Sequence, residues 1–184
     1  KLEHYVTQST SVTPAAPGTV CPIFQKFLHE ITGGDQEFQR YLQQWIGYCL
    51  TGDTKLQSLL FIYGTGGNGK GILMNAVLKI IGSYGANAAM ETFAATKHAR
   101  HLTELAMLKG KRLVIVSETE KGQAWSESRI NQVTGGDPIT ANYMRQDHFT
   151  YFPQFKLMIS GNHKPRLKSV NEAAKRRYNV VPFN

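Results

Sequence analysis

Apolar residues along the chain follow two spacings, one typical of helices and one typical of buried strands. Residues 24–31 and 38–49 repeat apolar side chains every three or four positions, which predicts two amphipathic helices. Gly33 and Gly34 end the first helix, and Asp35 is a candidate N-cap for the second. Short continuous apolar runs predict strands buried on both faces, at 58–63, 113–116, 156–160 and 180–183.

Other elements fill the spaces between these strands. The patterns predict a helix from the residues after Gly69 to about Gly82, and a strand near 89–93. They also predict a short helix at 102–108, a helix at 125–134 and a hairpin with arms 139–143 and 148–152. Alternation of helices with buried strands predicts an α/β fold with a mostly parallel sheet.

The strand at 58–63 and the helix after it enclose a glycine-rich run, and this order predicts a phosphate-binding loop. The run is Gly64-Thr65-Gly66-Gly67-Asn68-Gly69-Lys70, followed by Gly71 and Ile72. Glycines allow successive backbone N–H groups to curl around a triphosphate, and the helix N-terminus adds partial positive charge. Lys70 is positioned to reach the β- and γ-phosphates, so a nucleotide that carries these phosphates is the expected ligand.

Gly71 departs from the usual form of this loop. Ser or Thr at that position normally places a hydroxyl on Mg²⁺. Because Gly71 lacks this ligand, nucleotide binding is better supported by the sequence than hydrolysis is.

Composition narrows the class of protein. The 184 residues suffice for one well-buried domain with a small appendage, and we divide them into a linker or terminal segment (1–20), an N-terminal helical subdomain (21–56) and a P-loop ATPase core (57–184). Apolar runs are far shorter than the roughly 20 residues that span a bilayer, so no membrane association is expected. A formal net charge of +8 gives roughly even odds that the protein binds a polyanionic partner. The two cysteines lack nearby metal-ligand spacing, which fits a reducing, cytoplasmic compartment.

Three polar side chains follow buried strands, where catalytic groups of α/β proteins gather. Glu118 is a candidate to hold Mg²⁺ through ATP or to polarise the attacking water, and Glu120 is a second candidate. The alternative for both is a solvated strand end. Asn162 is a candidate to orient water or to contact the γ-phosphate, although Asn-His-Lys-Pro is also good turn chemistry.

Basic residues form two further candidate sites. Arg176 and Arg177 precede the last apolar run, and a guanidinium held there is suited to neutralise charge on a transferred phosphoryl group. A solvated basic patch is the alternative. At the hairpin tip, Arg145 lies between Tyr143 and His148, a combination suited to nucleic-acid contacts, although many hairpin tips are merely polar.

Taken in order, five segments resemble the motifs of superfamily-3 helicases, most closely the ATPase module of phage, plasmid and poxvirus-type primase-helicases. The match covers nearly the whole chain from Phe24 to Phe183. The segments resemble, in turn, Walker A (63–70), Walker B (112–122), the motif before sensor 1 with its hairpin (134–152), sensor 1 (160–165) and the arginine-finger segment (176–183).

This resemblance implies a P-loop, AAA+-like three-layer sandwich that works as an ATP-driven hexameric ring on single-stranded DNA during replication. Lys70 and Glu118 would act from one subunit, and Arg177, or less probably Arg176, from its neighbour. The hairpin with Arg145 would line the central channel. The resemblance also implies a location in the host cytoplasm, and a primase module and further C-terminal residues in a longer protein.

Two other functions stay open. Gly71 is compatible with a module that uses ATP to assemble on DNA with little or no hydrolysis. A small-molecule kinase is a third class, although the hairpin and the late arginine pair argue against it.

Overall fold

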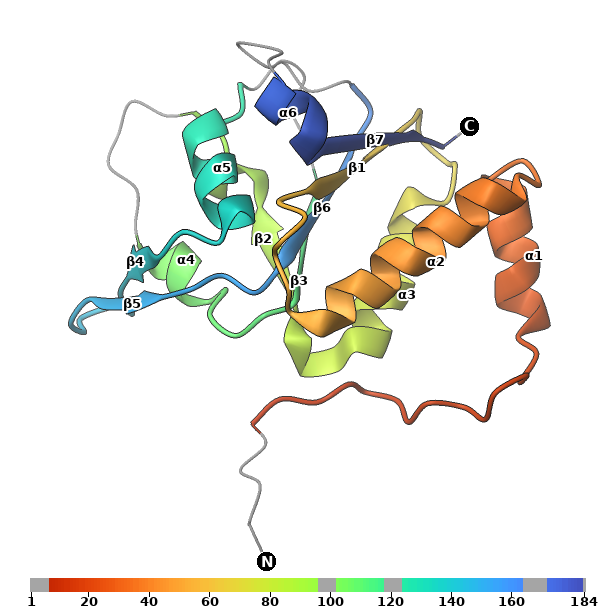
Figure 1. The fold of residues 1–184 in the computed structure, drawn as a ribbon, viewed down its shortest axis with the longest axis horizontal. Helices are drawn as coiled ribbons and strands as arrows, with labels where there is room; N and C mark the ends of the chain where they lie inside the picture. Colours follow the sequence, from red (N-terminus) through yellow and green to blue (C-terminus); the bar gives the residue numbers. More distant parts are fainter. Residues whose placement is uncertain (1–6, 96–101, 118–123, 164–171, 184) are drawn as a thin grey trace, which may run out of the picture.

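The computed structural model describes residues 7–95, 102–117, 124–163 and 172–183 (Figure 1). Its centre is a five-stranded sheet in which every pair of neighbouring strands is parallel. The strand order is β2-β3-β6-β1-β7. These strands span Gly85–Ala89 (β2), Leu113–Ser117 (β3), Lys156–Gly161 (β6), Leu59–Tyr63 (β1) and Tyr178–Pro182 (β7).

Helices cover both faces of this sheet, which makes the three-layer α/β sandwich that the sequence predicts (Figure 1). One face carries α1, α2 and α3, and the other carries α4, α5 and a short antiparallel hairpin of β4 and β5. The helices span Pro22–Ile31 (α1), Gln36–Thr51 (α2), Lys70–Ile81 (α3), Thr103–Ala106 (α4), Glu127–Gly135 (α5) and Glu172–Arg177 (α6), and the hairpin strands span Ile139–Ala141 (β4) and Phe149–Tyr151 (β5).

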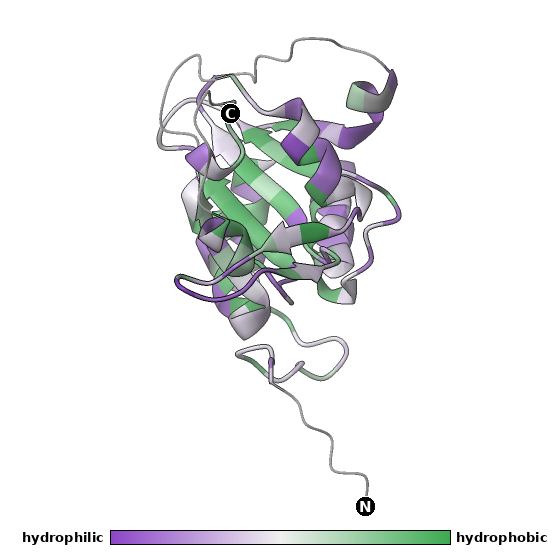
Figure 2. Ribbon diagram, turned by 90° about the vertical axis from the view of Figure 1, so that its left-hand side faces the viewer, coloured by the Kyte–Doolittle hydropathy of each residue, from purple (hydrophilic) through white to green (hydrophobic). Residues whose placement is uncertain are grey.

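The pleat of β1 explains why its sequence is apolar throughout. Leu59 and Phe61 belong to the core on the α5 side, whereas Leu60 and Ile62 belong to the core on the α3 side. All four are fully buried. Figure 2 shows the same arrangement, with apolar strands inside and helices of mixed polarity outside. Buried parallel strands of this kind read as continuous apolar runs.

The N-terminal helices begin and end as expected. Asp35 caps α2, since its Oδ1 accepts a hydrogen bond from Phe38 N at 3.0 Å, and Gly52 ends the helix in the left-handed conformation. Leu42, Trp45 and Cys49 of α2 lie in the same core cluster as β1 and α3. The two helices therefore form part of the layer that covers one sheet face.

Two sequence predictions were wrong in detail. The strand expected near 89–93 lies four residues earlier, as β2, and residues 90–92 form a 3-10 turn instead. Small residues are sufficient for β2 because it is an edge strand, while Met90 and Phe93 enter the core from the turn. Trp125 does not belong to α5; it is buried and forms an isolated bridge with Ala94.

Residues 7–20 contain no regular element, as expected, yet part of this segment is attached to the end of α3. Ser11 N donates to Ile80 O, and Ser83 N donates to Ser9 O, both at 3.1 Å. Within the described part of the chain, every helix is too short or too polar to cross a bilayer.

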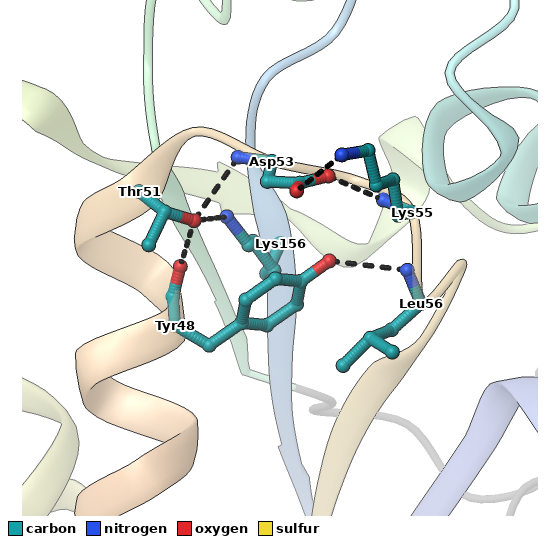
Figure 3. A network of polar contacts seen from close by, with 6 residues as sticks. All are labelled: Tyr48, Thr51, Asp53, Lys55, Leu56 and Lys156. Atoms are coloured by element: carbon teal, nitrogen blue, oxygen red, sulfur yellow. Dashed lines mark hydrogen bonds and ion pairs between the residues drawn. The ribbon is translucent and has the colours of Figure 1, made fainter.

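A buried lysine joins α2 to the amino end of the sheet (Figure 3). Lys156, the first residue of β6, is 2% exposed. Its Nζ lies 4.2 Å from the centre of the Tyr48 ring and donates to Thr51 Oγ1 at 3.4 Å. Burial, the largest effect, lowers the pKa of Lys156 to about 8, while nearby Cys49 and Asp53 oppose this shift.

Candidate functional site

The glycine-rich loop lies where its sequence predicts, between β1 and the N-terminus of α3. Gly69 occupies the N-cap position with φ 82°, and no side chain caps the first turn of α3. The first N–H groups of a helix lack partners within the helix, and Gly69 has no side chain that could cap them. The loop thus offers backbone donors and the positive end of a helix, the two features that favour an anion.

Lys70 is held inside the loop by three oxygens. Its Nζ donates to Gly64 O at 2.6 Å, to Thr65 O at 2.8 Å and to Asn68 Oδ1 at 2.8 Å. Three acceptors match the three protons of an ammonium group. Burial lowers the pKa of Lys70, a shift that a bound polyanion would counteract.

Asn68 connects the loop to the last strand. Its Nδ2 donates to Phe183 O at 2.5 Å, while its Oδ1 accepts from Lys70. Gly64 leaves the space for this contact, because a Cβ there would lie 2.1 Å from both Asn68 Nδ2 and Phe183 O. The sequence indicates Asn68 only as a loop residue; its partner is 115 positions away and carries no local signal.

An open pocket of about 440 Å³ lies over this loop. Asn162 reaches it from the end of β6, because Gly161 pairs with Tyr63 and accepts a hydrogen bond from Gly64 N at 3.3 Å. The structure thus brings Asn162 to the phosphate loop, as its proposed role requires. The lining residues are Gly66, Gly67, Asn68, Gly69, Lys70, Gly71, Ile72, Asn75 and Asn162.

Asn75 is a pocket residue that sequence reasoning missed. It is exposed on α3, one turn beyond Gly71, on the side that faces the pocket. The available signal was the helical spacing of four from a loop residue. Gly71 itself faces open space, since a Cβ there would meet nothing within 4 Å.

The two carboxylates expected beside this pocket, Glu118 and Glu120, lie outside the described residues. The last residue of β3, Ser117, pairs with Ser160 of β6. The carboxyl ends of β3, β6 and β1 therefore lie side by side at one edge of the sheet.

The arginine pair divides into a buried and an exposed member. Arg177 is 8% exposed; its Nε donates to Thr134 Oγ1 at 3.0 Å and its Nη2 to Gln57 Oε1 at 3.4 Å. Arg176 is exposed and has one long contact, 3.5 Å, to the same Gln57 oxygen. These adjacent residues at the end of α6 differ in burial although both reach Gln57 Oε1, and their sequence alone does not reveal this difference.

The predicted hairpin is present, with shorter strands than expected, and extends away from the sheet on the face opposite α3 (Figure 1). Tyr143, Arg145 and His148 are all exposed, and Arg145 has φ 59°. Tyr143 stacks on Phe149 with ring centres 5.3 Å apart, and Lys109 Nζ lies 4.7 Å from the Phe149 ring centre. Lys109 adds a cation that the sequence analysis did not include.

Metal-ligating side chains do not gather elsewhere in the described residues: no group of three or more His, Cys, Asp and Glu is present among them. Cys21 is exposed and Cys49 is buried, and both are free thiols.

The chain matches a protein family and is similar to several known proteins. A family model described as "Family of unknown function (DUF5906)" matches residues 62–177. "Putative helicase L207/L206" of Acanthamoeba polyphaga mimivirus is 28% identical over 151 residues, and "Putative helicase 022R" of Frog virus 3 is 24% identical over 155. Each alignment covers 81% of this chain, which spans 16% of the length of either viral protein.

Solved structures share the fold. The apo NrS-1 C-terminal region superimposes with a TM-score of 0.70 at 16% identity, covering 90% of this chain and 39% of that one. JCV helicase gives a TM-score of 0.53 at 15% identity, covering 90% and 46%. The resemblance to superfamily-3 helicase modules that the motifs indicate is thereby confirmed.

Proposed function

The chain belongs to the DUF5906 family, and we propose that it is the ATP-driven motor module of a replicative DNA helicase, hydrolysing ATP between the subunits of a hexameric ring that moves on single-stranded DNA. The observation that carries this proposal is the phosphate-loop pocket, which Lys70 lines from the first turn of α3 and Asn162 from the end of β6. Both viral relatives are named helicases, which supports the same reading.

The loop suits a triphosphate chemically. Lys70 would exchange the loop oxygens it now contacts for β- and γ-phosphate oxygens, and the uncapped N–H groups of α3 would donate to the others. Asn162 would orient the attacking water with its amide. Mg²⁺, held through the phosphates and Glu118, would neutralise phosphate charge.

The arginine finger falls to Arg176 in this proposal, contrary to the preference for Arg177 that the sequence suggests. Arg177 is committed to Thr134 and Gln57 inside its own subunit, whereas Arg176 is exposed. An exposed guanidinium is available to a neighbouring subunit, where it would neutralise charge on the transferred phosphoryl group.

The hairpin is the proposed contact for DNA. Tyr143, Arg145, His148 and Lys109 combine aromatic surface with positive charge, which suits a single-stranded backbone with stacked bases.

The test is DNA-stimulated ATP hydrolysis by the wild type and by Lys70→Ala, with Lys79→Ala as the matched control. Lys79 is an exposed lysine near the end of the same helix. We expect the control to keep stimulated hydrolysis and Lys70→Ala to lose it. Wild-type protein that assembles on DNA with ATP and shows no turnover would refute the motor proposal.

Gly71 supports a second candidate, an ATP-dependent assembly module with little turnover. Gly71→Ser separates the two, since open space around the Cβ position admits the new side chain without a clash. A large gain in hydrolysis would favour the assembly module as the natural state. An unchanged rate would show that the hydroxyl is dispensable here.

A further inference from the structure

A second depression adjoins the phosphate-loop pocket, between α1 and the first turns of α3. We call it the α1–α3 groove; it has a volume of about 380 Å³. Ile72 lines both spaces, so they share a wall. The residues that line the groove are Cys21, Ile23, Phe24, Phe27, Ile72 and Ala76.

The wall of this groove is apolar and partly aromatic. Its lining side chains include no hydroxyl, amide or charged group. The rings of Phe24 and Phe27 lie 6.1 Å apart with 32° between their planes, and both are half-buried. Ile23 is 86% exposed and Ile72 is 64% exposed. Apolar side chains left open beside a polar pocket mark a surface that a ligand or partner covers.

The groove is fixed relative to the phosphate loop by direct packing. A Cβ on Gly69 would lie 2.7 Å from Ile31 Cγ2 and 3.1 Å from Phe27 Cε2. Helix α1 therefore rests against the last glycine of the loop, and one of its aromatic residues, Phe27, also lines the groove. A molecule anchored in the loop would meet the groove at a set position.

We propose that the α1–α3 groove holds the base of the nucleotide whose phosphates occupy the loop; this inference rests on the proposed function. Ile72 lies in the first turn of α3, and Ala76 lies four residues, or about 6 Å, further along the same face. A molecule that leaves the loop along this face enters the groove. A flat heterocycle attached to phosphates fits its apolar, aromatic lining.

The lining also determines selectivity. The described lining side chains include no hydrogen-bonding group, so the groove contacts the faces of the base and makes no side-chain hydrogen bond to its polar edge. Discrimination between one base and another then depends on the apolar area that each base buries. We expect ATP and GTP to bind within about threefold of each other, and both to bind more tightly than CTP, whose base is smaller.

The first test compares ATP with inorganic tripolyphosphate by isothermal titration calorimetry, since only ATP carries a base. Ile23→Ala removes a part of the groove wall that lies outside the phosphate-loop pocket, and Ile80→Ala is the matched control, an isoleucine that is 47% exposed and outside both spaces. We expect Ile23→Ala to weaken ATP binding about tenfold and leave tripolyphosphate binding unchanged. Ile80→Ala is expected to change neither.

The second test uses the thiol of Cys21 as a reporter. Cys21 is exposed and lines the groove, whereas Cys49 is fully buried, so a thiol reagent reports on Cys21. We expect ATP to slow modification at least about fivefold, because the base covers the thiol, and tripolyphosphate to leave the rate unchanged.

The outcomes separate this inference from the proposed function. Equal affinities for ATP and tripolyphosphate, with Cys21 equally reactive in both, would overturn the base site and leave the phosphate site standing. Failure of both compounds to bind would overturn both. A rate of Cys21 modification that falls as the protein concentration rises, and does not respond to ATP, would mean that a second copy of the chain covers the groove. This result would also overturn the proposal.

Discussion

Two lysines lie at opposite ends of the same parallel sheet, and their surroundings differ in kind. Lys70 follows β1 at the carboxyl edge, is half-buried, and contacts oxygens of a loop that borders an open pocket. Lys156 begins β6 at the amino edge, is almost fully buried, and lies against the Tyr48 ring and the Thr51 hydroxyl (Figure 3).

Burial lowers the pKa of both amines, so the pKa shift alone does not identify a functional lysine. What separates them is whether their partners are exchangeable. The loop oxygens around Lys70 are replaceable by those of a ligand entering the pocket, whereas Lys156 is 2% exposed and contacts the Tyr48 ring and the Thr51 hydroxyl of α2, away from that pocket. We therefore propose a functional role for Lys70 and a structural role for Lys156.

The largest expected effect is on nucleotide binding by Lys70→Met. Loss of charge-assisted hydrogen bonds to phosphates should weaken ATP binding about 100-fold, while the free energy of unfolding changes by less than about 1 kcal/mol. Calorimetric titration and urea denaturation measure the two quantities. Intact ATP affinity in this variant would remove the distinction between the two lysines.

The arginine pair extends the comparison to α6. Arg177→Met should lower the free energy of unfolding by about 2–3 kcal/mol, because it removes two hydrogen bonds that a buried, charged donor makes to Thr134 Oγ1 and Gln57 Oε1. Arg176→Met should leave stability within about 0.5 kcal/mol of the wild type. Urea denaturation of both variants checks this. Equal stability losses would contradict the division of roles between the arginines.

Gly69 tests the contact between the loop and α1. Its φ of 82° and the nearby Ile31 methyl leave no room for a side chain, so Gly69→Ala should destabilise the protein by about 1–3 kcal/mol. Gly47→Ala is the control: Gly47 lies within α2 with nothing near a Cβ, and the change should stabilise by about 0.5–1 kcal/mol. Thermal unfolding of the two variants, Gly69→Ala and Gly47→Ala, distinguishes local strain at Gly69 from a general effect of an added methyl group on stability.

Lys156→Met has the smallest expected effect and the most specific pH dependence. Replacing a buried charge with an apolar side chain of similar length should raise the free energy of unfolding at pH 7 by about 1 kcal/mol. The pKa of Lys156 is about 8 in the folded protein and near its ordinary value of 10.5 when unfolded, so the unfolded chain binds more protons between these values.

The free energy of unfolding of the wild type therefore rises with pH between pH 8 and pH 10.5 as Lys156 loses its proton. The amount by which Lys156→Met exceeds the wild type in free energy of unfolding should shrink over the same range. Urea denaturation of both proteins at several pH values measures this difference. A difference that stays constant with pH would contradict the assignment of a depressed pKa to Lys156.

Local signals explain how much of the fold the sequence predicts. The phosphate loop, the Asp35 cap, the buried strands and the hairpin each depend on residues close together in the chain. Edge strand β2 was misplaced because its five small residues carry no apolar pattern, while the more apolar residues after it form a turn.

The rest depends on contacts between distant residues. Asn68 meets Phe183, Arg177 meets Thr134, and Lys156 enters the layer formed by α2; no local pattern marks these pairs. Phe24 and Phe27 predict a helix face in the core, yet in the structure they also line an open groove. Sequence periodicity shows that a face is apolar without showing what covers it.

The central claim is that each ATP site is completed by a neighbouring subunit, and a mixing experiment tests it most directly. Lys70→Ala and Arg176→Ala should each be inactive alone in DNA-stimulated hydrolysis. In a ring of both, the intact Lys70 of one subunit meets the intact Arg176 of the next at about a quarter of interfaces, so an equal mixture should recover about that share of wild-type activity. A mixture as inactive as either variant, with wild type active, would contradict the claim.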